Sequence, residues 1–110
     1  MLPRQEYILA TLQACVTACQ QTNRLVAQQP DDNQLSRAAR LSLDCADLCQ
    51  LTAAFVVRDS EHLIYVLREC AELCRTCADE QARHAAIVAT CRQGEQACRR
   101  AEDACRTAYH

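Results

Sequence analysis

The chain has 110 residues, a net charge of −2 and a pI near 5.9. This length suits one domain with a single core, and the charge excludes the basic surface that binding to nucleic acid or anionic lipid requires. One glycine and two prolines leave few helix breakers. The composition therefore predicts an all-α fold, with one domain over residues 1–110.

Four amphipathic segments follow one another along the chain. The predicted helices cover about residues 4–28, 34–57, 61–83 and 87–108. A turn cluster at 29–33 and helix-capping residues at 58–60 separate the first three segments. No strong breaker stands at 83–86, but an unbroken helix of about 50 residues would be unusual in a small domain. Short connections favour antiparallel neighbours, so we expect an up-down-up-down four-helix bundle.

Cysteine makes up ten of the 110 residues, mostly at steps of three, four or seven within these segments. Such steps place side chains on one face of a helix, so each helix presents two or three sulfurs to the bundle interior. The cysteines are Cys15, Cys19, Cys45, Cys49, Cys70, Cys74, Cys77, Cys91, Cys98 and Cys105. The sequence therefore predicts a cysteine-lined core.

Antiparallel packing predicts which sulfurs share a height in the bundle. Turns near residues 31, 60 and 85 place Cys45 opposite Cys74 and Cys49 opposite Cys70. The turn near 85 brings Cys98 to the height of residue 72. The sulfurs expected to converge at mid-height are those of Cys15, Cys19, Cys45, Cys49, Cys70, Cys74, Cys77 and Cys98.

The last two cysteines are expected outside this midsection. Cys91 is expected one layer away, toward Cys77. Cys105 is expected near Ile8 and Tyr65, without a sulfur neighbour. Both are kept as candidate metal ligands, ranked below the other eight.

Thiolates are ligands for soft metal ions, so the pattern favours metal binding. Cysteine can also act as a small hydrophobe, but alanine, valine or leucine would fill the same space without the risk of oxidation. Structural zinc sites usually lie on loops, and iron–sulfur clusters draw on cysteines in irregular backbone. Thiolates along helical seams suit Cu(I), and two thiolates per ion would limit the load to about five ions.

Three stretches of the chain also carry a family resemblance. They are Arg-Leu-Ser-Leu-Asp-Cys-Ala-Asp-Leu-Cys-Gln-Leu at 40–51, Cys-Ala-Glu-Leu-Cys-Arg-Thr-Cys-Ala-Asp-Glu at 70–80 and Cys-Arg-Arg-Ala-Glu-Asp-Ala-Cys at 98–105. They resemble the cysteine-rich four-helix bundle copper-storage proteins. The resemblance implies interior thiolates that hold many Cu(I) ions, often in a tetramer, with all ten cysteines as ligands.

The chain resembles a cysteine-depleted member of this family. Where richer members continue the row of cysteines, other residues stand here, which implies a lower copper capacity. The positions concerned are Ile8, Leu12, Thr22, Val26, Leu67, Gln81, Gly94 and Ala101. His84 resembles the family's histidine-bearing turn and is expected to help ions enter the bundle. Its alternative role is a favourable interaction with a helix dipole.

Two readings without metal are possible. Disulfides could staple a helical interaction module, with the pairs Cys15–Cys49 and Cys19–Cys45. The Cys-x-x-Cys pair at 74–77 could be a redox pair, but it lies within a helix and no βαβ pattern surrounds it. A thiol-packed core with no metal role belongs to the same group of alternatives.

The remaining sequence features bear on the cellular location and on enzymatic activity. No run approaches the roughly 18 apolar residues of a membrane span, and the first residues lack the pattern of a secretory signal. We therefore expect a cytoplasmic protein whose thiols stay reduced. No catalytic constellation stands out, so no enzymatic activity is expected. The sequence predicts a Cu(I)-binding protein for copper storage, buffering or detoxification, with metal ions as its partners.

Overall fold

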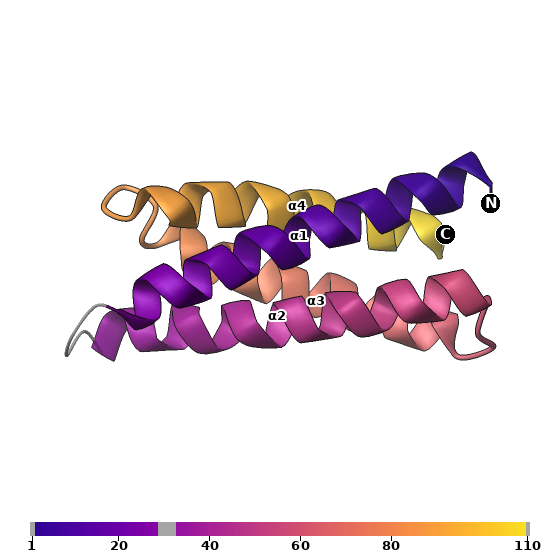
Figure 1. Ribbon diagram of the computed structural model, residues 1–110, viewed down its shortest axis with the longest axis horizontal. Helices are drawn as coiled ribbons and strands as arrows, with labels where there is room; N and C mark the ends of the chain where they lie inside the picture. Colours follow the sequence, from indigo (N-terminus) through magenta and orange to yellow (C-terminus); the bar gives the residue numbers. More distant parts are fainter. Residues whose placement is uncertain (1, 29–32, 110) are drawn as a thin grey trace.

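The computed structural model describes residues 2–28 and 33–109. Within them, four helices run antiparallel along a common axis (Figure 1). The helices are α1 (Pro3–Ala27), α2 (Asn33–Arg58), α3 (Leu63–Ala82) and α4 (Ala89–Ala108). The bundle measures 44 × 19 × 19 Å, so it is two helices wide in both directions across its axis. The predicted all-α up-down-up-down bundle is confirmed.

Each helix packs against two neighbours, in the cyclic order α1, α2, α3, α4. In Figure 1, α1 and α4 form the upper half of the rod, and α2 and α3 form the lower half. One side of each helix therefore faces a shared central axis. This arrangement lets residues from all four helices meet at one height.

The link between α2 and α3 is a tight turn. Asp59 adopts the left-handed backbone conformation with a φ of 50°, which aspartate tolerates better than most residues. The N–H of Ser60 donates to the carbonyl of Phe55, and the N–H of Asp59 donates to the carbonyl of Val56. These two hydrogen bonds form a Schellman motif that ends α2. The predicted capping segment therefore ends one helix, and α3 begins at Leu63, two residues later than predicted.

The structure describes the α3–α4 link, whereas most of the α1–α2 link lies outside the described residues. Residues 29–32 of the predicted turn cluster lie outside the described part of the chain. At the second link, α3 ends at Ala82 and α4 begins at Ala89, so the chain turns in the region of the predicted break. Turn hydrogen bonds between residues three apart interrupt the helical pattern there, including one from the N–H of Ile87 to the carbonyl of His84.

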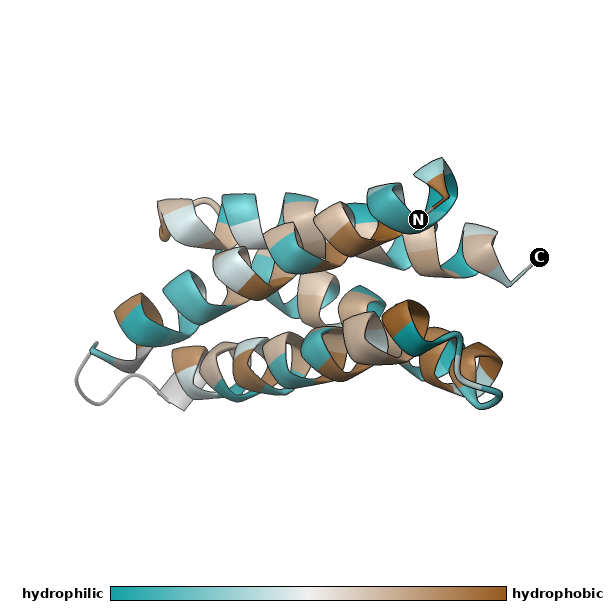
Figure 2. Ribbon diagram, turned by 45° about the vertical axis from the view of Figure 1, so that its right-hand side comes forward, coloured by the Kyte–Doolittle hydropathy of each residue, from teal (hydrophilic) through white to brown (hydrophobic). Residues whose placement is uncertain are grey.

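Small side chains fill the interior. Cysteine and alanine account for most of the buried positions, and Leu12 is the bulkiest side chain with no exposed surface. Figure 2 shows hydrophilic and hydrophobic residues interspersed along each of the helices. Because cysteine and alanine are short, the helices approach closely enough for sulfurs on different helices to touch.

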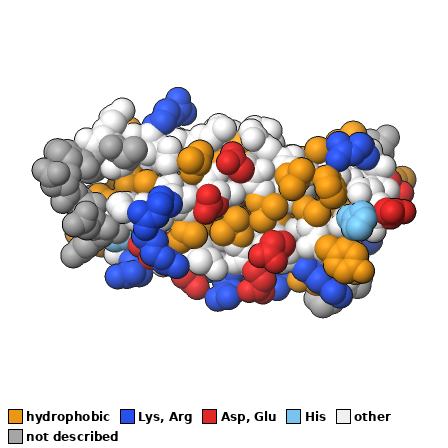
Figure 3. Space-filling model, turned by 90° about the horizontal axis from the view of Figure 1, so that it is seen from below, with side chains coloured by type: hydrophobic (Ala, Val, Ile, Leu, Met, Phe, Trp, Pro, Cys, Tyr) orange, Lys and Arg blue, Asp and Glu red, His pale blue; other side chains and the backbone are white. Residues whose placement is uncertain are grey.

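The outer surface mixes charges with scattered apolar side chains. Figure 3 shows one such face, on which orange side chains alternate with acidic and basic groups. Leu43, Leu51 and Tyr65 are among the exposed apolar residues of α2 and α3. Within residues 2–28 and 33–109, no helix carries an apolar stretch long enough to cross a lipid bilayer.

Candidate metal centre

All ten cysteines point into the bundle. None of them has exposed surface, and all ten are free thiols. The predicted cysteine-lined core is confirmed. The disulfide pairs Cys15–Cys49 and Cys19–Cys45, predicted by the alternative reading, do not occur.

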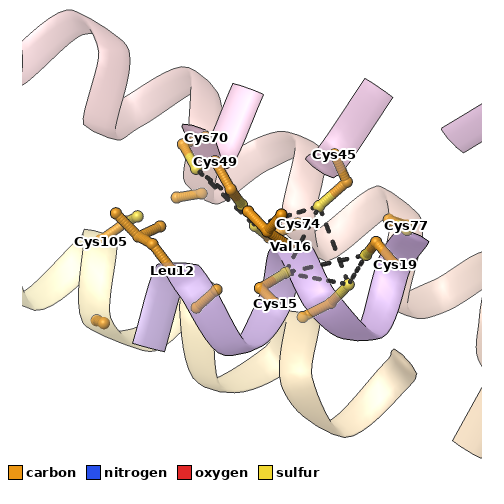
Figure 4. Close-up of a cluster of buried hydrophobic side chains, with 14 of the residues drawn as sticks. Leu12, Cys15, Val16, Cys19, Cys45, Cys49, Cys70, Cys74, Cys77 and Cys105 are labelled. Carbon is orange, nitrogen blue, oxygen red and sulfur yellow. Dashed lines mark hydrogen bonds between the residues drawn. The ribbon is translucent and has the colours of Figure 1, made fainter. Parts of the chain in front are cut away.

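The sulfurs of the midsection lie in contact across the helices (Figure 4). The Sγ atom of Cys15 on α1 lies 3.8 Å from that of Cys45 on α2 and 3.7 Å from that of Cys98 on α4. The Sγ atom of Cys45 lies 3.7 Å from that of Cys74 on α3. Sulfurs from all four helices therefore converge at one height.

Two further pairs extend this contact along the axis. The Sγ atoms of Cys49 and Cys70 are 3.8 Å apart, and those of Cys19 and Cys98 are 3.5 Å apart. The predicted oppositions of Cys49 with Cys70 and of Cys45 with Cys74 are both confirmed. The sulfurs form a continuous row rather than isolated pairs.

Four-sulfur groups occur twice in this row. Within each group, all sulfurs lie within 4.8 Å of one another. The groups are Cys15, Cys45, Cys49 and Cys74, and Cys15, Cys19, Cys45 and Cys98. Because both contain Cys15 and Cys45, ions held by the two groups would share thiolates.

The distances suit shared metal ions. A disulfide requires about 2.05 Å between sulfurs, far less than the 3.5 to 4.0 Å of the sulfur contacts. With metal–thiolate bonds of about 2.3 Å, as for zinc, two sulfurs can share an ion at separations up to about 4.6 Å. The neighbouring thiols are therefore close enough to bridge ions without large movements of the helices.

Cys105 corrects one prediction. It was expected near Tyr65 without a sulfur neighbour, but its thiol interacts with that of Cys70, five residues further along α3. The reason is the register of α4 against α3. A shift in the same direction appears on the surface, where Arg106 pairs with Glu72 at 3.0 Å. Cys98 likewise interacts with Cys77, beyond the expected height of residue 72.

Cys77 and Cys91 lie toward the end of the bundle that carries the α3–α4 turn. The Cys77 thiol interacts with those of Cys19, Cys45 and Cys98, so it adjoins the row. Cys91 packs in a separate cluster with Val26 and Leu35. We use the name sulfur array for the nine cysteines whose thiols interact with one another, seven of them through direct sulfur contacts and Cys77 and Cys105 through interactions that shift their pKa values. They are Cys15, Cys19, Cys45, Cys49, Cys70, Cys74, Cys77, Cys98 and Cys105.

Mutual hydrogen bonds change the acidity of these thiols. Hydrogen bonds from the neighbouring thiols, first Cys19 and then Cys45, lower the pKa of Cys15 below its ordinary value. Interactions with the thiols of Cys15 and Cys19, together with burial, raise the pKa of Cys45. Burial, with the charges of Cys77 and Glu80, raises the pKa of Cys91. Ions that bind the thiols whose pKa is raised must displace protons.

A cluster that the sequence analysis missed lies at the α3–α4 turn. The Glu80 side chain is 2% exposed, and its Oε2 atom lies 3.0 Å from Nε2 of His84. Arg37 and Arg83 donate to Oε1 of Glu80 over 2.7 and 3.1 Å. Burial raises the pKa of Glu80, but the hydrogen bonds from His84 and Arg37 outweigh it and hold that pKa below its ordinary value. We call Arg37, Glu80, Arg83 and His84 the charged end.

A spacing in the sequence could have revealed this cluster. Glu80 and His84 are four residues apart, so they face the same side of one helical turn. The structure places His84 directly after α3, buried and paired with Glu80.

Fold and site together define a class of protein. A water-excluded row of reduced thiols from four helices provides many soft ligands at bridging distances, which suits a protein that binds several soft metal ions. No other described part of the chain brings comparable metal-ligating groups so close together.

Comparison with known proteins identifies the family. The family model described as Copper storage protein matches residues 3–110, so the chain belongs to the copper storage protein family. A curated relative is the uncharacterized cysteine-rich protein YhjQ of Bacillus subtilis. It is 28% identical over 83 residues, which are 73% of this chain and 77% of the relative.

Solved structures agree with this assignment. The cytosolic copper storage protein of Streptomyces lividans, loaded with five coppers, superimposes with a TM-score of 0.91 at 33% identity. That match covers 96% of this chain and 92% of the other. The Streptomyces lividans protein loaded with ten copper equivalents also superimposes with a TM-score of 0.91, at 32% identity over 96% of this chain and 83% of the other.

Proposed function

We propose that this protein stores Cu(I) as thiolate-bound ions inside the bundle and thereby buffers or detoxifies copper. The observation that carries the proposal is the sulfur array, in which nine buried thiols interact and seven of them form one continuous row of sulfur contacts. A protein that used cysteine only for packing would have no need to bring so many sulfurs into mutual contact.

The sharing of sulfurs favours Cu(I) over zinc. A structural zinc site uses four ligands in a closed tetrahedron. The two four-sulfur groups have Cys15 and Cys45 in common, so they cannot form two independent tetrahedra. Low-coordinate Cu(I) accepts bridging thiolates, and a row of bridging thiolates holds several ions. If two thiolates hold each ion, the capacity is about five ions per chain.

The proposal also includes a cellular location and a set of copper ligands. The Streptomyces lividans relative is a cytosolic protein, and we place this store in the cytoplasm, where thiols stay reduced. Storage requires binding and release but no catalysis. All ten cysteines are proposed as ligands, with Cys91 outside the main cluster. His84 is proposed to help ions enter at the charged end, and a tetrameric assembly stays a prediction.

The test is an anaerobic Cu(I) titration of the reduced protein against a chromophoric Cu(I) chelator. We expect several ions per chain to be retained, with the ultraviolet charge-transfer absorption of Cu(I)–thiolate bonds. A parallel titration with Zn(II) should give fewer and weaker sites. Retention of no more than one Cu(I) per chain would contradict copper storage.

A thiol count tests the disulfide alternative. Protein purified without reductant under anaerobic conditions is denatured and reacted with a thiol reagent. We expect all ten thiols to react, because the structure contains ten free cysteines. A stapled interaction module would instead show few reactive thiols and no copper uptake.

A further inference from the structure

An uncharged amide lies against one end of the sulfur array. Gln81 on α3 is fully buried, with no exposed surface. An amide in the interior is unfavourable unless its hydrogen-bonding groups find partners. The surroundings of Gln81 therefore indicate what its side chain does.

Both halves of the amide have partners. Its Nε2 atom donates to Sγ of Cys77 over 3.2 Å, and a longer contact of 3.8 Å reaches Sγ of Cys98. Its Oε1 atom accepts from the hydroxyl of Thr22 over 3.2 Å. Thr22 thus fixes the amide so that its donors face the sulfurs and its oxygen faces away from them.

The backbone of α4 leaves room for this amide. Gly94 is the chain's only glycine, and a Cβ atom at this position would overlap Oε1 and Cδ of Gln81. The amide therefore occupies the space that a side chain on α4 would take. Gln81, Thr22 and Gly94 together form a polar layer across the bundle.

This polar layer lies next to the last sulfurs of the array. Cys77 and Cys98 contact the amide, whereas Cys91 packs in a separate cluster with Val26 and Leu35. The array therefore ends at a pair of N–H donors. At its opposite end, Cys105 and Cys70 lie near Leu12 and the apolar core.

An N–H donor next to the sulfurs has a chemical role in a copper cluster. A cluster in which thiolates outnumber Cu(I) ions carries net negative charge in a dry interior. N–H groups directed at thiolate sulfur stabilise that charge and orient the ligand without binding the metal. Groups that support metal ligands in this way typically change metal affinity by about 10- to 100-fold when they are removed.

We propose that Gln81 is a positioning residue of the copper cluster, whose amide donates hydrogen bonds to the Cys77 and Cys98 thiolates and terminates the cluster at that end. This inference rests on the proposed storage of Cu(I). It assigns a role to a residue that is not itself a ligand. A purely space-filling role over Gly94 would predict effects on stability alone.

The test replaces the amide by an apolar group of similar size, Gln81→Leu. Thr22 keeps an acceptor in this variant, because its hydroxyl also lies 3.3 Å from the carbonyl oxygen of Thr90. Anaerobic competition with a Cu(I) chelator should show about 10- to 100-fold weaker binding of the most weakly held ions. The Cu(I)–thiolate absorption band should also change, because two ligand sulfurs lose a hydrogen-bond donor.

The matched control is Thr90→Val. The Thr90 hydroxyl is buried close to the same layer and has no hydrogen-bond partner among the described residues, so valine removes no such bond. We expect wild-type copper affinity and absorption for this variant. Thermal unfolding of the copper-free proteins separates loss of stability from loss of affinity.

A second variant keeps the proposal testable if Gln81→Leu does not fold. Gly94→Ala retains the amide but displaces it from the sulfurs, so it should weaken Cu(I) binding in the same direction. If wild-type protein binds several ions and both folded variants bind them with wild-type affinity and spectrum, the role of Gln81 is overturned while copper storage stands. If wild-type protein binds none, the proposed function itself fails, and this inference with it.

Discussion

The sulfur array and the charged end solve opposite problems inside one bundle. The array gathers groups that are neutral as thiols and become negatively charged thiolates when they bind metal. Only a bound ion can balance that charge in the interior. The charged end gathers opposite charges that satisfy one another, with Glu80 held by Arg37, Arg83 and His84. Binding capacity and structural stability are therefore separable, and substitutions in the two regions should change different measurements.

The largest expected effect comes from the two cysteines that both four-sulfur groups share. The double variant Cys15→Ala/Cys45→Ala should lower the Cu(I) load to roughly half or less, because each bridging position is lost with them. Copper per chain is measured after anaerobic loading and gel filtration, with helical content followed by circular dichroism.

The matched control for this variant is Val16→Ala, which creates a cavity beside the same part of α1 without removing a sulfur. Val16 is 2% exposed. We expect some loss of stability and a wild-type copper load. Equal loss of copper in both proteins would mean that core packing, rather than thiolate ligation, governs uptake.

The next effect concerns the charged end. Glu80→Gln removes the charge that Arg37 and His84 face, and it should lower the free energy of unfolding of the copper-free protein by about 1–3 kcal/mol. Urea denaturation under reducing conditions measures this change. The Cu(I) load should stay at the wild-type value.

Glu72→Gln serves as the comparison, because Glu72 is half exposed and pairs with Arg75 and Arg106 on the surface. Water screens those pairs, so the loss should be clearly smaller than for Glu80→Gln. Similar losses of stability in the two variants would show that burial of Glu80 does not strengthen its ion pairs.

The smallest effect separates two cysteines that the sequence treats alike. Cys105→Ala should reduce the Cu(I) load by up to about one ion, since this thiol interacts with that of Cys70 in the array. Cys91→Ala should change the load less, because Cys91 packs with Val26 and Leu35. Mass spectrometry of the loaded proteins under non-denaturing conditions resolves the number of ions. A larger loss of Cu(I) for Cys91→Ala than for Cys105→Ala would show that the copper cluster extends to Cys91 instead.

Much of the site was predictable because its cause is local. Cysteines three or four residues apart must share a helical face whatever the helix packs against. Antiparallel hairpins with short turns then bring α2 against α3, which is why the contacts of Cys45 with Cys74 and Cys49 with Cys70 followed from counting residues.

The register of α4 could not be counted in the same way. The α3–α4 turn lacks a strong breaker, and the offset between the helices depends on how their surfaces fit. Side-chain interactions such as those of Arg106 with Glu72 and of Cys105 with Cys70 show the result. An error of five residues in this register is about 7.5 Å along a helix, enough to give Cys105 a different neighbour.

The sequence by itself determined that the protein is helical, that its helices form a bundle and that cysteines line the interior, because helix propensity and periodicity act within each segment. Only the tertiary structure decided which sulfurs the α4 cysteines approach, how Glu80 is neutralised and where Gln81 directs its amide. These features depend on the rotation and axial offset of one helix against another, which packing of the whole bundle sets and residue spacing within one helix does not.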